Sequence, residues 1–210
     1  MYVPTTLAQP AGALAPAGVL STATPIVTPV GTAMSVRSEK LNVLDGREAS
    51  VSGTLRPGLA GRVVMLQELD GHRWRTVARA RTRSAGRFRL RYRPHRTGSE
   101  RVRLRFAGDL LDRDAERRLG WLTVYRLAEA SWYGGGGSLA CGGSLTTTTM
   151  GVANKTLPCG TLVTLRYGDR SVRVPVVDRG PYVSGREFDL TQATKQALGF
   201  GDTGDVWSSR

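Results

Sequence analysis

The stretch SVRVPVVDRGPYVSGREFDLT, residues 171–191, organises the C-terminal half of this chain. An apolar run ends at Asp178, a Gly-Pro pair follows, and a second aspartate, Asp189, stands eleven residues after the first. A short apolar run of this length favours a strand, and the Gly-Pro pair favours a tight turn after it. We therefore expect a strand that ends on a carboxylate, a turn, and a short helix that opens at residues 188–191 and runs through Leu198.

Four motifs occur in order along this half of the chain. They are Ser131-Trp132-Tyr133-Gly134, Lys155-Thr156-Leu157-Pro158-Cys159-Gly160-Thr161, Asp178-Arg179-Gly180-Pro181-Tyr182 and Gly185-Arg186-Glu187-Phe188-Asp189-Leu190-Thr191. In this order and spacing they resemble the double-psi β-barrel of the rare lipoprotein A (RlpA) family, whose relatives include membrane-bound lytic transglycosylases and the expansins. The resemblance covers about residues 128–206 and implies a six-stranded double-psi β-barrel, which we place at residues 128–210.

The resemblance also implies a function. The bacterial enzymes of the family cut peptidoglycan between N-acetylmuramic acid and N-acetylglucosamine without water and leave a 1,6-anhydro product. We therefore predict a peptidoglycan lytic transglycosylase that acts on the glycan strands of the cell wall. The alternative is a non-catalytic protein that binds wall polysaccharide, or loosens it as expansins do.

The residues can supply this chemistry. Breaking a glycosidic bond requires an acid at the leaving oxygen, and Asp or Glu is the usual donor. In the lytic reaction the C6 hydroxyl of the sugar closes the ring, so the protein needs no nucleophile. We predict Asp178 and Asp189 as the acid/base pair. A free Asp has a pKa of about 3.9, so the acid role requires an upward shift through burial or mutual repulsion. Alternatively, Asp178 caps its turn, and Asp189 or Thr191 caps the helix.

Six further residues are candidates for binding the glycan. Aromatic rings can stack on the apolar faces of sugars, although each aromatic here is equally consistent with a place in the core. Arginine can bind the lactyl or peptide carboxylates of the wall polymer, and an amide can orient a sugar by hydrogen bonding. These candidates are Trp132, Tyr133, Tyr182, Arg179, Arg186 and Asn154.

Two departures from the family pattern favour the non-catalytic alternative. The family's enzymes usually have Ala-His before the Lys/Arg-Thr-Leu-Pro motif, and this chain has Asn154 at the histidine position. Asn can form hydrogen bonds but cannot titrate. The usual Thr-Ala-Asn-Gly-Glu stretch, with its additional carboxylate, is replaced by residues 141–149.

The two cysteines, Cys141 and Cys159, lie 18 residues apart inside the predicted barrel. We expect a disulfide, and with it an oxidising, extracytoplasmic location in the cell wall or the medium; two buried thiols are the alternative. Two Cys and two His exclude a Cys/His zinc cluster, and metal catalysis would need carboxylates alone. We predict neither a metal nor a cofactor.

The composition is that of a globular chain, with 40% hydrophobic and 22% charged residues. Residues 36–127 alternate with period two, most clearly at Arg87-Phe88-Arg89-Leu90-Arg91, which predicts half-buried antiparallel strands. Turn signals about every ten residues favour a sandwich, and the pattern resembles small immunoglobulin-like modules of bacterial surface proteins. The predicted fold class is therefore all-β: an immunoglobulin-like β-sandwich followed by the barrel.

The positive charge is concentrated in the sandwich. Residues 36–127 contain 22 Lys/Arg against 10 Asp/Glu, and residues 128–210 contain 8 against 7. The arginines either keep a strand face soluble or bind an anionic wall polymer. We do not expect nucleic acid, because Phe88, Tyr92 and Phe106 fall on the apolar side of their strands rather than among the arginines.

Residues 1–35 carry no charge and include five prolines, at positions 4, 10, 16, 25 and 29. Pro16, Pro25 and Pro29 are incompatible with a transmembrane helix over residues 11–30. We interpret residues 1–35 as a disordered Pro/Ala/Thr-rich tether or a clipped export signal.

Overall fold

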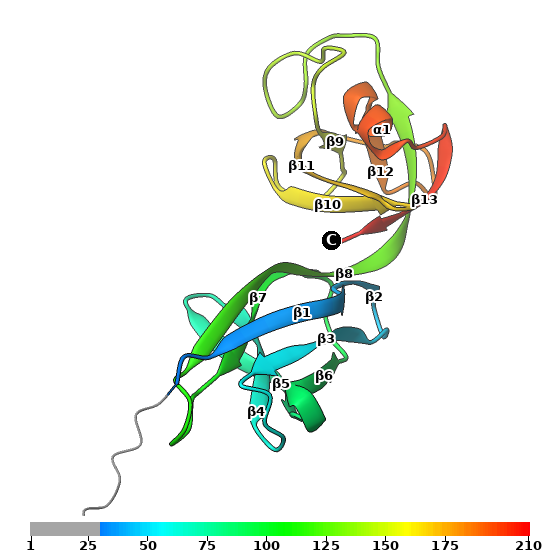
Figure 1. The fold of residues 1–210 in the computed structure, drawn as a ribbon. Helices are drawn as coiled ribbons and strands as arrows, with labels where there is room; N and C mark the ends of the chain where they lie inside the picture. Colours follow the sequence, from blue (N-terminus) through cyan, green and yellow to red (C-terminus); the bar gives the residue numbers. More distant parts are fainter. Residues whose placement is uncertain (1–29) are drawn as a thin grey trace, which may run out of the picture.

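The computed structural model describes residues 30–210, which form two β-rich bodies in succession (Figure 1). One long strand, β8 (Ala115–Tyr133), begins in the first body and ends in the second. The all-β prediction is confirmed. Most of the predicted tether or export signal, residues 1–29, lies outside the described residues. Within residues 30–210, no helix is long and apolar enough to cross a membrane.

The first body consists of two sheets and a short 3-10 turn at Ser84–Gly86. One sheet contains β1 (Ala33–Lys40), β3 (Ala49–Arg56) and β6 (Arg87–Tyr92). The other contains β5 (Arg73–Arg81), β4 (Val63–Asp70), β7 (Gly98–Phe106), the first part of β8, and β2 (Asn42–Leu44).

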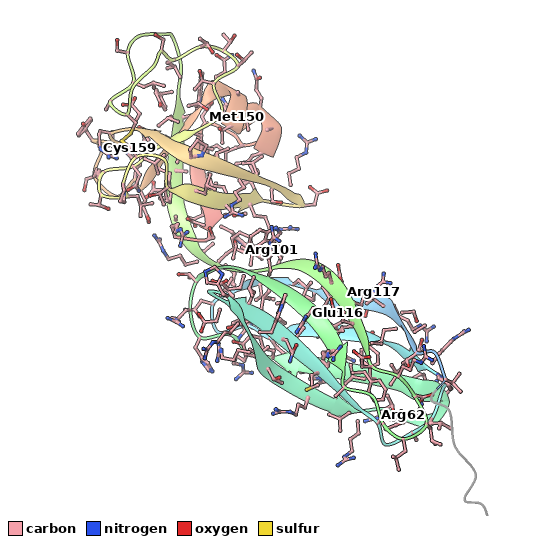
Figure 2. The ribbon with its side chains drawn as sticks, turned by 90° about the vertical axis from the view of Figure 1, so that its left-hand side faces the viewer. Arg62, Arg101, Glu116, Arg117, Met150 and Cys159 are labelled. Atoms are coloured by element: carbon pink, nitrogen blue, oxygen red, sulfur yellow. A yellow bond between two sulfur atoms is a disulfide. The ribbon has the colours of Figure 1, made fainter. Side chains whose placement is uncertain are left out.

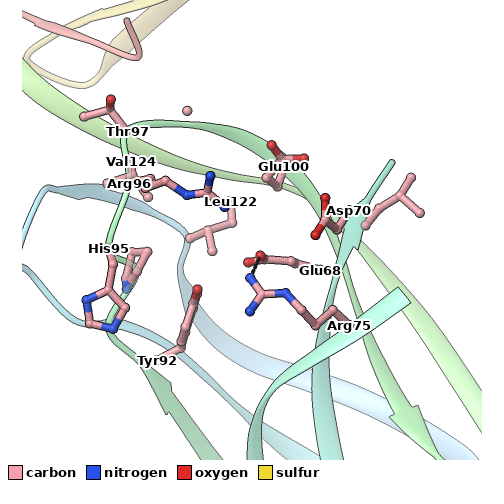
Figure 3. A pocket seen from close by; sticks show the side chains of 13 residues that line it. Glu68, Asp70, Arg75, Tyr92, His95, Arg96, Thr97, Glu100, Leu122 and Val124 are labelled. Carbon is pink, nitrogen blue, oxygen red and sulfur yellow. Dashed lines mark hydrogen bonds and ion pairs between the residues drawn. The ribbon is translucent and has the colours of Figure 1, made fainter. Parts of the chain in front are cut away.

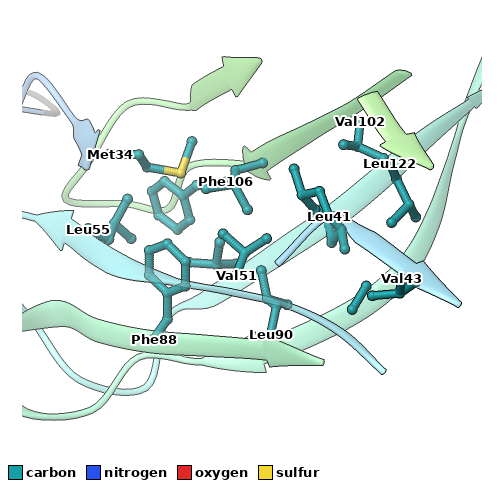
Figure 4. Close-up of a cluster of buried hydrophobic side chains, with 14 of the residues drawn as sticks. Met34, Leu41, Val43, Val51, Leu55, Phe88, Leu90, Val102, Phe106 and Leu122 are labelled. Atoms are coloured by element: carbon teal, nitrogen blue, oxygen red, sulfur yellow. The ribbon is translucent and has the colours of Figure 1, made fainter. Parts of the chain in front are cut away.

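Strand alternation explains how these sheets share one core (Figure 4). In β6, Phe88 and Leu90 are buried, whereas Arg87, Arg89 and Arg91 between and beside them are exposed. The inward side chains of both sheets meet in a single hydrophobic cluster. An immunoglobulin-like strand topology for this body stays a prediction.

The structure moves one predicted boundary and changes the nature of another. Strand β1 begins at Ala33 and Met34 is buried, so residues 33–35 belong to the first sheet and not to the tether. Residues 33–35 are uncharged like the residues before them, which is why the sequence assigned them to the tether. The strand signal was the spacing of Met34 and Val36, which lie two residues apart, as residues on one face of a strand do. At residue 127 there is no connecting loop, because β8 runs through it unbroken.

The second body is a closed barrel. Around the ring the strands follow the order β8, β13, β10, β11, β9, β12 and back to β8. The barrel strands that follow β8 along the chain are β9 (Val152–Ala153), β10 (Leu162–Tyr167), β11 (Arg170–Asp178), β12 (Phe188–Thr191) and β13 (Thr203–Ser208). The prediction of six barrel strands is confirmed.

One short helix, α1 (Gln192–Leu198), follows β12. The Thr191 side chain accepts a hydrogen bond from the Thr194 N–H and thereby caps the helix, and Gly199 ends it with a φ of 65°. The predicted helix therefore exists, but residues 188–191 form a strand before it. Asp189 lies in this strand and is not the cap.

Candidate functional site

A row of side chains crosses four strands of the barrel. Ser131 of β8 pairs with Asp189 of β12, Asp189 pairs with Ala153 of β9, and Ala153 pairs with Asp178 of β11. Residues directly opposite one another in a sheet point to the same face. The register shift between Val176 and Asp178 puts Asp178 opposite Ala153, so the two aspartates share a face with Ala153 between them. We call these four residues the carboxylate row.

The carboxylate row faces away from the barrel core. Val152 and Leu190, the chain neighbours of Ala153 and Asp189, belong to the buried hydrophobic cluster, and strand neighbours point to opposite faces. Asp178 and Asp189 are half-buried. The predicted acid/base pair is thus brought together on the outer wall of the barrel.

Asp178 is held by two backbone amides. Its Oδ1 accepts hydrogen bonds from the Arg179 N–H at 2.8 Å and from the Ala140 N–H at 2.9 Å. The first bond is the turn cap that the sequence left open as an alternative. The second fastens the loop after β8 to the row. The Asp178 Oδ2 forms no hydrogen bond or ion pair within residues 30–210, so one oxygen stays available.

Asp189 is held by the row itself. The Ser131 hydroxyl donates a hydrogen bond to the Asp189 Oδ1. Its Oδ2 forms no hydrogen bond or ion pair with the part of the chain that the structure describes. Each aspartate therefore has one fixed oxygen and one free oxygen.

Tyr133 connects the two aspartates electrostatically. Burial raises the pKa of its phenol, and the negative charges of Asp178 and then Asp189 raise it further. Its hydroxyl is buried and forms no hydrogen bond with the described residues. At neutral pH the phenol is un-ionised, so it can donate a proton in a hydrogen bond at this site. A buried donor beside two carboxylates can bind an oxygen of a bound molecule.

The predicted disulfide between Cys141 and Cys159 is present, with Cα atoms 5.5 Å apart. It joins the loop after β8 to the loop between β9 and β10. The Cys141 N–H also donates to the Val177 carbonyl at 3.2 Å, next to Asp178 in the chain. The disulfide thus fixes the loop whose Ala140 amide holds Asp178.

The Asn154 side chain, which we predicted as a donor to the glycan, is engaged with backbone groups. It is 3% exposed, and its Oδ1 accepts from the Thr156 N–H at 3.0 Å and the Leu157 N–H at 2.8 Å. Its Nδ2 donates to the Glu187 carbonyl at 3.1 Å. Because it follows directly after β9 and shapes the next turn, its side chain is committed to backbone groups.

Arg179 is likewise occupied. Its Nη1 donates to the carbonyls of Asn154 at 3.0 Å and Leu157 at 2.9 Å, and its Nη2 lies 3.1 Å from the Cys159 Sγ. The guanidinium group therefore holds the loop between β9 and β10 against the turn after β11. The prediction that it binds wall carboxylates is not supported by this geometry.

The remaining candidates lie in different places. Trp132 is on the opposite face of β8 from Ser131, where its Nε1 donates to Asp202 at 2.9 Å and Lys195 lies over its ring at 3.9 Å. The structure does not bring it to the aspartates. Tyr182 is 84% exposed, and Arg186 is half-buried with no ion pair in residues 30–210. Both stay predictions as substrate contacts.

Three residues of the site were not predicted from the sequence: Ser131, Ala140 and Ala153. Strand pairing brings Ser131 and Ala153 next to Asp189, and the Ala140 backbone amide donates a hydrogen bond to Asp178. The alternation of Ser131, Trp132 and Tyr133 was a signal for Ser131, because Ser131 and Tyr133 must share a face.

A pocket of the first body is a separate feature (Figure 3). It has a volume of about 410 Å³, and Glu68, Glu100, Tyr92 and His95 are among the residues that line it. Burial raises the pKa of Glu100, with further contributions from nearby carboxylates. Glu68 is paired with Arg75. None of its lining residues belongs to the barrel, so it does not extend the carboxylate row.

Comparison with known proteins identifies the barrel. The lytic transglycolase family model matches residues 127–206, which is the six-stranded body with its carboxylate row. Residues 127–206 are similar to the double-psi β-barrel of the RlpA family. We call them the RlpA-like barrel. The first body, with its two sheets, lies outside this match.

Curated relatives of the RlpA-like barrel carry names that state an activity. The probable endolytic peptidoglycan transglycosylase RlpA of Aquifex aeolicus is 44% identical over 75 residues, which are 33% of this chain and 33% of the relative. The endolytic peptidoglycan transglycosylase RlpA of Pseudomonas aeruginosa strain UCBPP-PA14 is 41% identical over 87 residues, 39% of this chain and 26% of the relative. The chain thus spans a third or less of the length of these two relatives.

Among solved structures, Streptomyces papain inhibitor aligns with 40% of this chain and 91% of its own, at 22% identity and a TM-score of 0.33. This likeness is too low to bear on the fold or the function.

Proposed function

We propose that the RlpA-like barrel is a lytic transglycosylase that cleaves peptidoglycan glycan strands and leaves 1,6-anhydro ends. The observation that carries this proposal is the carboxylate row: Asp178 and Asp189 on one face, separated by Ala153, each with a free oxygen. The names of the relatives support the substrate and the reaction class.

The sheet sets the spacing of the row at its backbone. Neighbouring strands lie about 4.8 Å apart, so the backbones of β11 and β12, with β9 between them, are about 10 Å apart. The two aspartates project from these backbones on the same face, so a sugar can lie along the row and react with its own hydroxyl group.

In the proposed reaction the aspartates of the row donate one proton and accept one. A protonated aspartate of the row donates its proton to the bridging oxygen as the bond from the anomeric carbon C1 to that oxygen breaks. The C6 hydroxyl oxygen of the same sugar forms a bond to C1, and its proton passes to a carboxylate of the row. No water is consumed, and the products are a free hydroxyl on one side and a 1,6-anhydro sugar on the other.

The surroundings supply the other requirements. The Tyr133 hydroxyl, buried and without a partner in the described residues, donates a hydrogen bond to a sugar oxygen between the aspartates. Tyr182 and Arg186, on the loop between β11 and β12, contact the flanking sugars or their carboxylates. The disulfide supports an oxidising, extracytoplasmic compartment, where peptidoglycan lies.

The second candidate is a wall-binding barrel without catalysis. Asn154, at the position where the family usually has histidine, is bonded to backbone groups, and His72 and His95 both belong to the first body. No imidazole is therefore available among the described residues of the barrel. In this alternative the same face holds the glycan but does not cut it.

One experiment separates the two. The full chain is incubated with purified peptidoglycan glycan strands, and mass spectrometry measures 1,6-anhydro ends for the wild type, Asp178→Asn and Asp189→Asn. Asp205→Asn, an exposed aspartate on β13, is the matched control. We expect each row variant to lose about 100-fold or more in rate and the control to keep the wild-type rate. Binding of the strands without any product in the wild type would leave only the second candidate.

A further inference from the structure

A hollow of about 330 Å³ lies on the outer face of the second sheet, where the first body meets the barrel. Trp74 of β5, Arg101 of β7, and Arg118 and Trp121 of β8 are among its lining residues. Figure 2 shows Arg101 at the point where the two bodies meet. We call this feature the junction hollow.

A β-bulge explains why the hollow forms at this point. The pairing of β7 with β8 shifts by one residue between Val102 and Arg103, which leaves Leu119 unpaired. Gly120, next to it, has a φ of +90° and open space where a side chain would stand. A bulge increases the local twist of a sheet, and a glycine removes the side chain that would fill the gap.

Two tryptophan rings hold three of the arginines of this region. Arg101 lies over Trp121 at 5.3 Å, and Arg173 of the barrel strand β11 reaches the same ring at 4.7 Å. Arg103 lies over Trp74 at 4.2 Å, but Glu116 neutralises it at 2.7 Å.

Three arginines therefore keep their charge unpaired. The side chains of Arg101, Arg118 and Arg173 form no ion pair and no hydrogen bond with any other residue among 30–210. All three are exposed. Cation–π contacts fix the direction of a guanidinium group without cancelling its charge. Arg101 and Arg118 line the junction hollow, and Arg173 reaches it from the barrel through the Trp121 ring. The hollow thus gathers three positive charges from both bodies, and Trp121 orients two of them.

We propose that the junction hollow binds a phosphodiester-linked polyanion of the cell wall, with Arg101, Arg118 and Arg173 contacting its phosphate groups. Guanidinium groups match phosphate oxygens in geometry, and they approach from β7 and β8 on one body and from β11 on the other. A phosphodiester keeps its charge at every physiological pH, and its non-bridging oxygens accept hydrogen bonds from several directions. The inference does not depend on whether the barrel cuts glycan.

Nucleic acid shares the phosphate chemistry but needs more than charge. Single-strand binders stack bases on aromatic side chains with a free face. Trp74 and Trp121 do stand among the arginines, an arrangement that the sequence alone did not reveal. However, their rings already carry the guanidinium groups of Arg103, Arg101 and Arg173. The observations therefore favour a polyanion without bases.

The position of Arg173 gives such binding a consequence for the barrel. It lies five residues before Asp178 on β11, which is about 16 Å along an extended strand. A polymer chain held in the junction hollow is therefore anchored beside the strand that ends in the carboxylate row. We infer that the first body ties the protein to the charged part of the wall.

The test uses the full chain and purified poly(glycerol phosphate), with binding followed by titration calorimetry. The site variant is Arg101→Gln, Arg118→Gln, Arg173→Gln. The matched control is Arg87→Gln, Arg89→Gln, Arg91→Gln, which removes the same charge from the outer face of the other sheet. We expect the site variant to bind about 30-fold more weakly or worse, and the control to change less than about threefold. Equal losses in both, or no loss in either, would overturn the proposal.

Two further measurements separate this site from general charge attraction. A fourfold rise in salt should weaken wild-type binding about 20- to 40-fold, if three phosphate contacts release counterions as they do on DNA, and weaken the site variant much less. Trp121→Leu, which keeps every charge, should still weaken binding several-fold because two guanidinium groups lose their platform. Unchanged binding by Trp121→Leu would contradict the role of the ring. Circular dichroism and thermal unfolding confirm that each variant is folded.

Two other polymers identify the ligand class. Poly-glutamate carries carboxylates at similar density, and oligo(dT) carries phosphodiesters with bases. We expect poly(glycerol phosphate) to bind most tightly of the three. Tighter binding of oligo(dT), with quenching of tryptophan fluorescence that Trp121→Leu removes, would assign the junction hollow to single-stranded nucleic acid instead. Tighter binding of poly-glutamate would assign it to carboxylates.

Discussion

Asp178 and Asp189 pair with the same residue, Ala153, from its two sides. Strand β9 is only two residues long, yet it fixes both carboxylates relative to each other. One of the two pairings is parallel and the other antiparallel, so the aspartates approach Ala153 from strands that run in opposite directions. Because the row is part of the sheet, its spacing is set by backbone hydrogen bonding and not by flexible loops.

Ser131→Ala tests whether the row positions Asp189. The Ser131 hydroxyl donates to the Asp189 Oδ1, and hydrogen bonds to charged groups are worth about 1.5–3 kcal/mol. We expect the turnover rate for anhydro-product formation to fall about tenfold while KM for glycan strands stays unchanged.

Ser144→Ala, an exposed serine in the loop after β8, is the control for the Ser131 experiment and should match the wild type. An equal loss in turnover for both serine variants would show that the effect is not specific to the row. A rise in KM alone would instead assign Ser131 to substrate binding.

The disulfide is predicted to stabilise both the barrel and the position of Asp178. Closing a loop of 18 residues contributes about 3 kcal/mol to the free energy of unfolding. Replacing Cys141 and Cys159 together by Ser should lower that free energy by this amount, measured by urea unfolding. Activity should also fall, because the Ala140 amide then no longer holds Asp178 firmly.

Reductant provides the internal control for the disulfide. It should lower the stability of the wild type to that of the double Ser variant and leave the variant unchanged. A wild-type protein with the same stability in both conditions would refute the contribution of the disulfide.

Local patterns explain what the sequence could predict. The alternation Arg87-Phe88-Arg89-Leu90-Arg91 predicts a half-buried strand because period two is a property of consecutive residues. The barrel and its disulfide followed from motifs that lie close to one another in the chain. The all-β class, the six barrel strands and the short helix could therefore be predicted from the sequence.

Contacts between distant residues explain what could not be predicted. Ser131 and Asp189 are 58 residues apart, and no local pattern sets their register. The sequence could mark Arg179 as a candidate for binding carboxylates, but it could not place its guanidinium group on the carbonyls of the loop between β9 and β10. Trp121 and Arg173 come from different bodies, so their contact was invisible in either half alone.

Asn154→Ala tests the structural role that replaces the predicted glycan contact. The variant leaves the amides of Thr156 and Leu157 and the carbonyl of Glu187 without their partner. Unsatisfied buried groups cost about 1–3 kcal/mol each, so we expect a loss of about 2–4 kcal/mol in the free energy of unfolding. Below its unfolding transition the variant should bind glycan strands with wild-type affinity.

Asn154→Asp is the conservative comparison for Asn154→Ala. It keeps the two hydrogen bonds that Oδ1 accepts, so it should lose less stability than Asn154→Ala does. If Asn154→Ala weakened glycan binding strongly with unchanged stability, Asn154 would be a substrate contact after all.

Tyr133→Phe should change how stability depends on alkaline pH. The pKa of the Tyr133 phenol is raised in the folded state by burial and by Asp178, whereas an unfolded tyrosine has a pKa of about 10. The folded protein therefore retains the phenolic proton that the unfolded chain loses. Its contribution to stability is complete below about pH 10 and is lost as the pH rises toward the raised value.

Urea unfolding at a series of pH values measures this difference. Between about pH 10 and 12 the wild type should lose about 1 kcal/mol or more that Tyr133→Phe does not lose. Tyr125, whose pKa burial also raises, is present in both proteins and cancels in the comparison. Tyr182→Phe, at an 84% exposed position, should follow the wild type. Parallel curves for the wild type and Tyr133→Phe would mean that the phenol is not the buried, protonated donor between Asp178 and Asp189 on which the proposed mechanism relies.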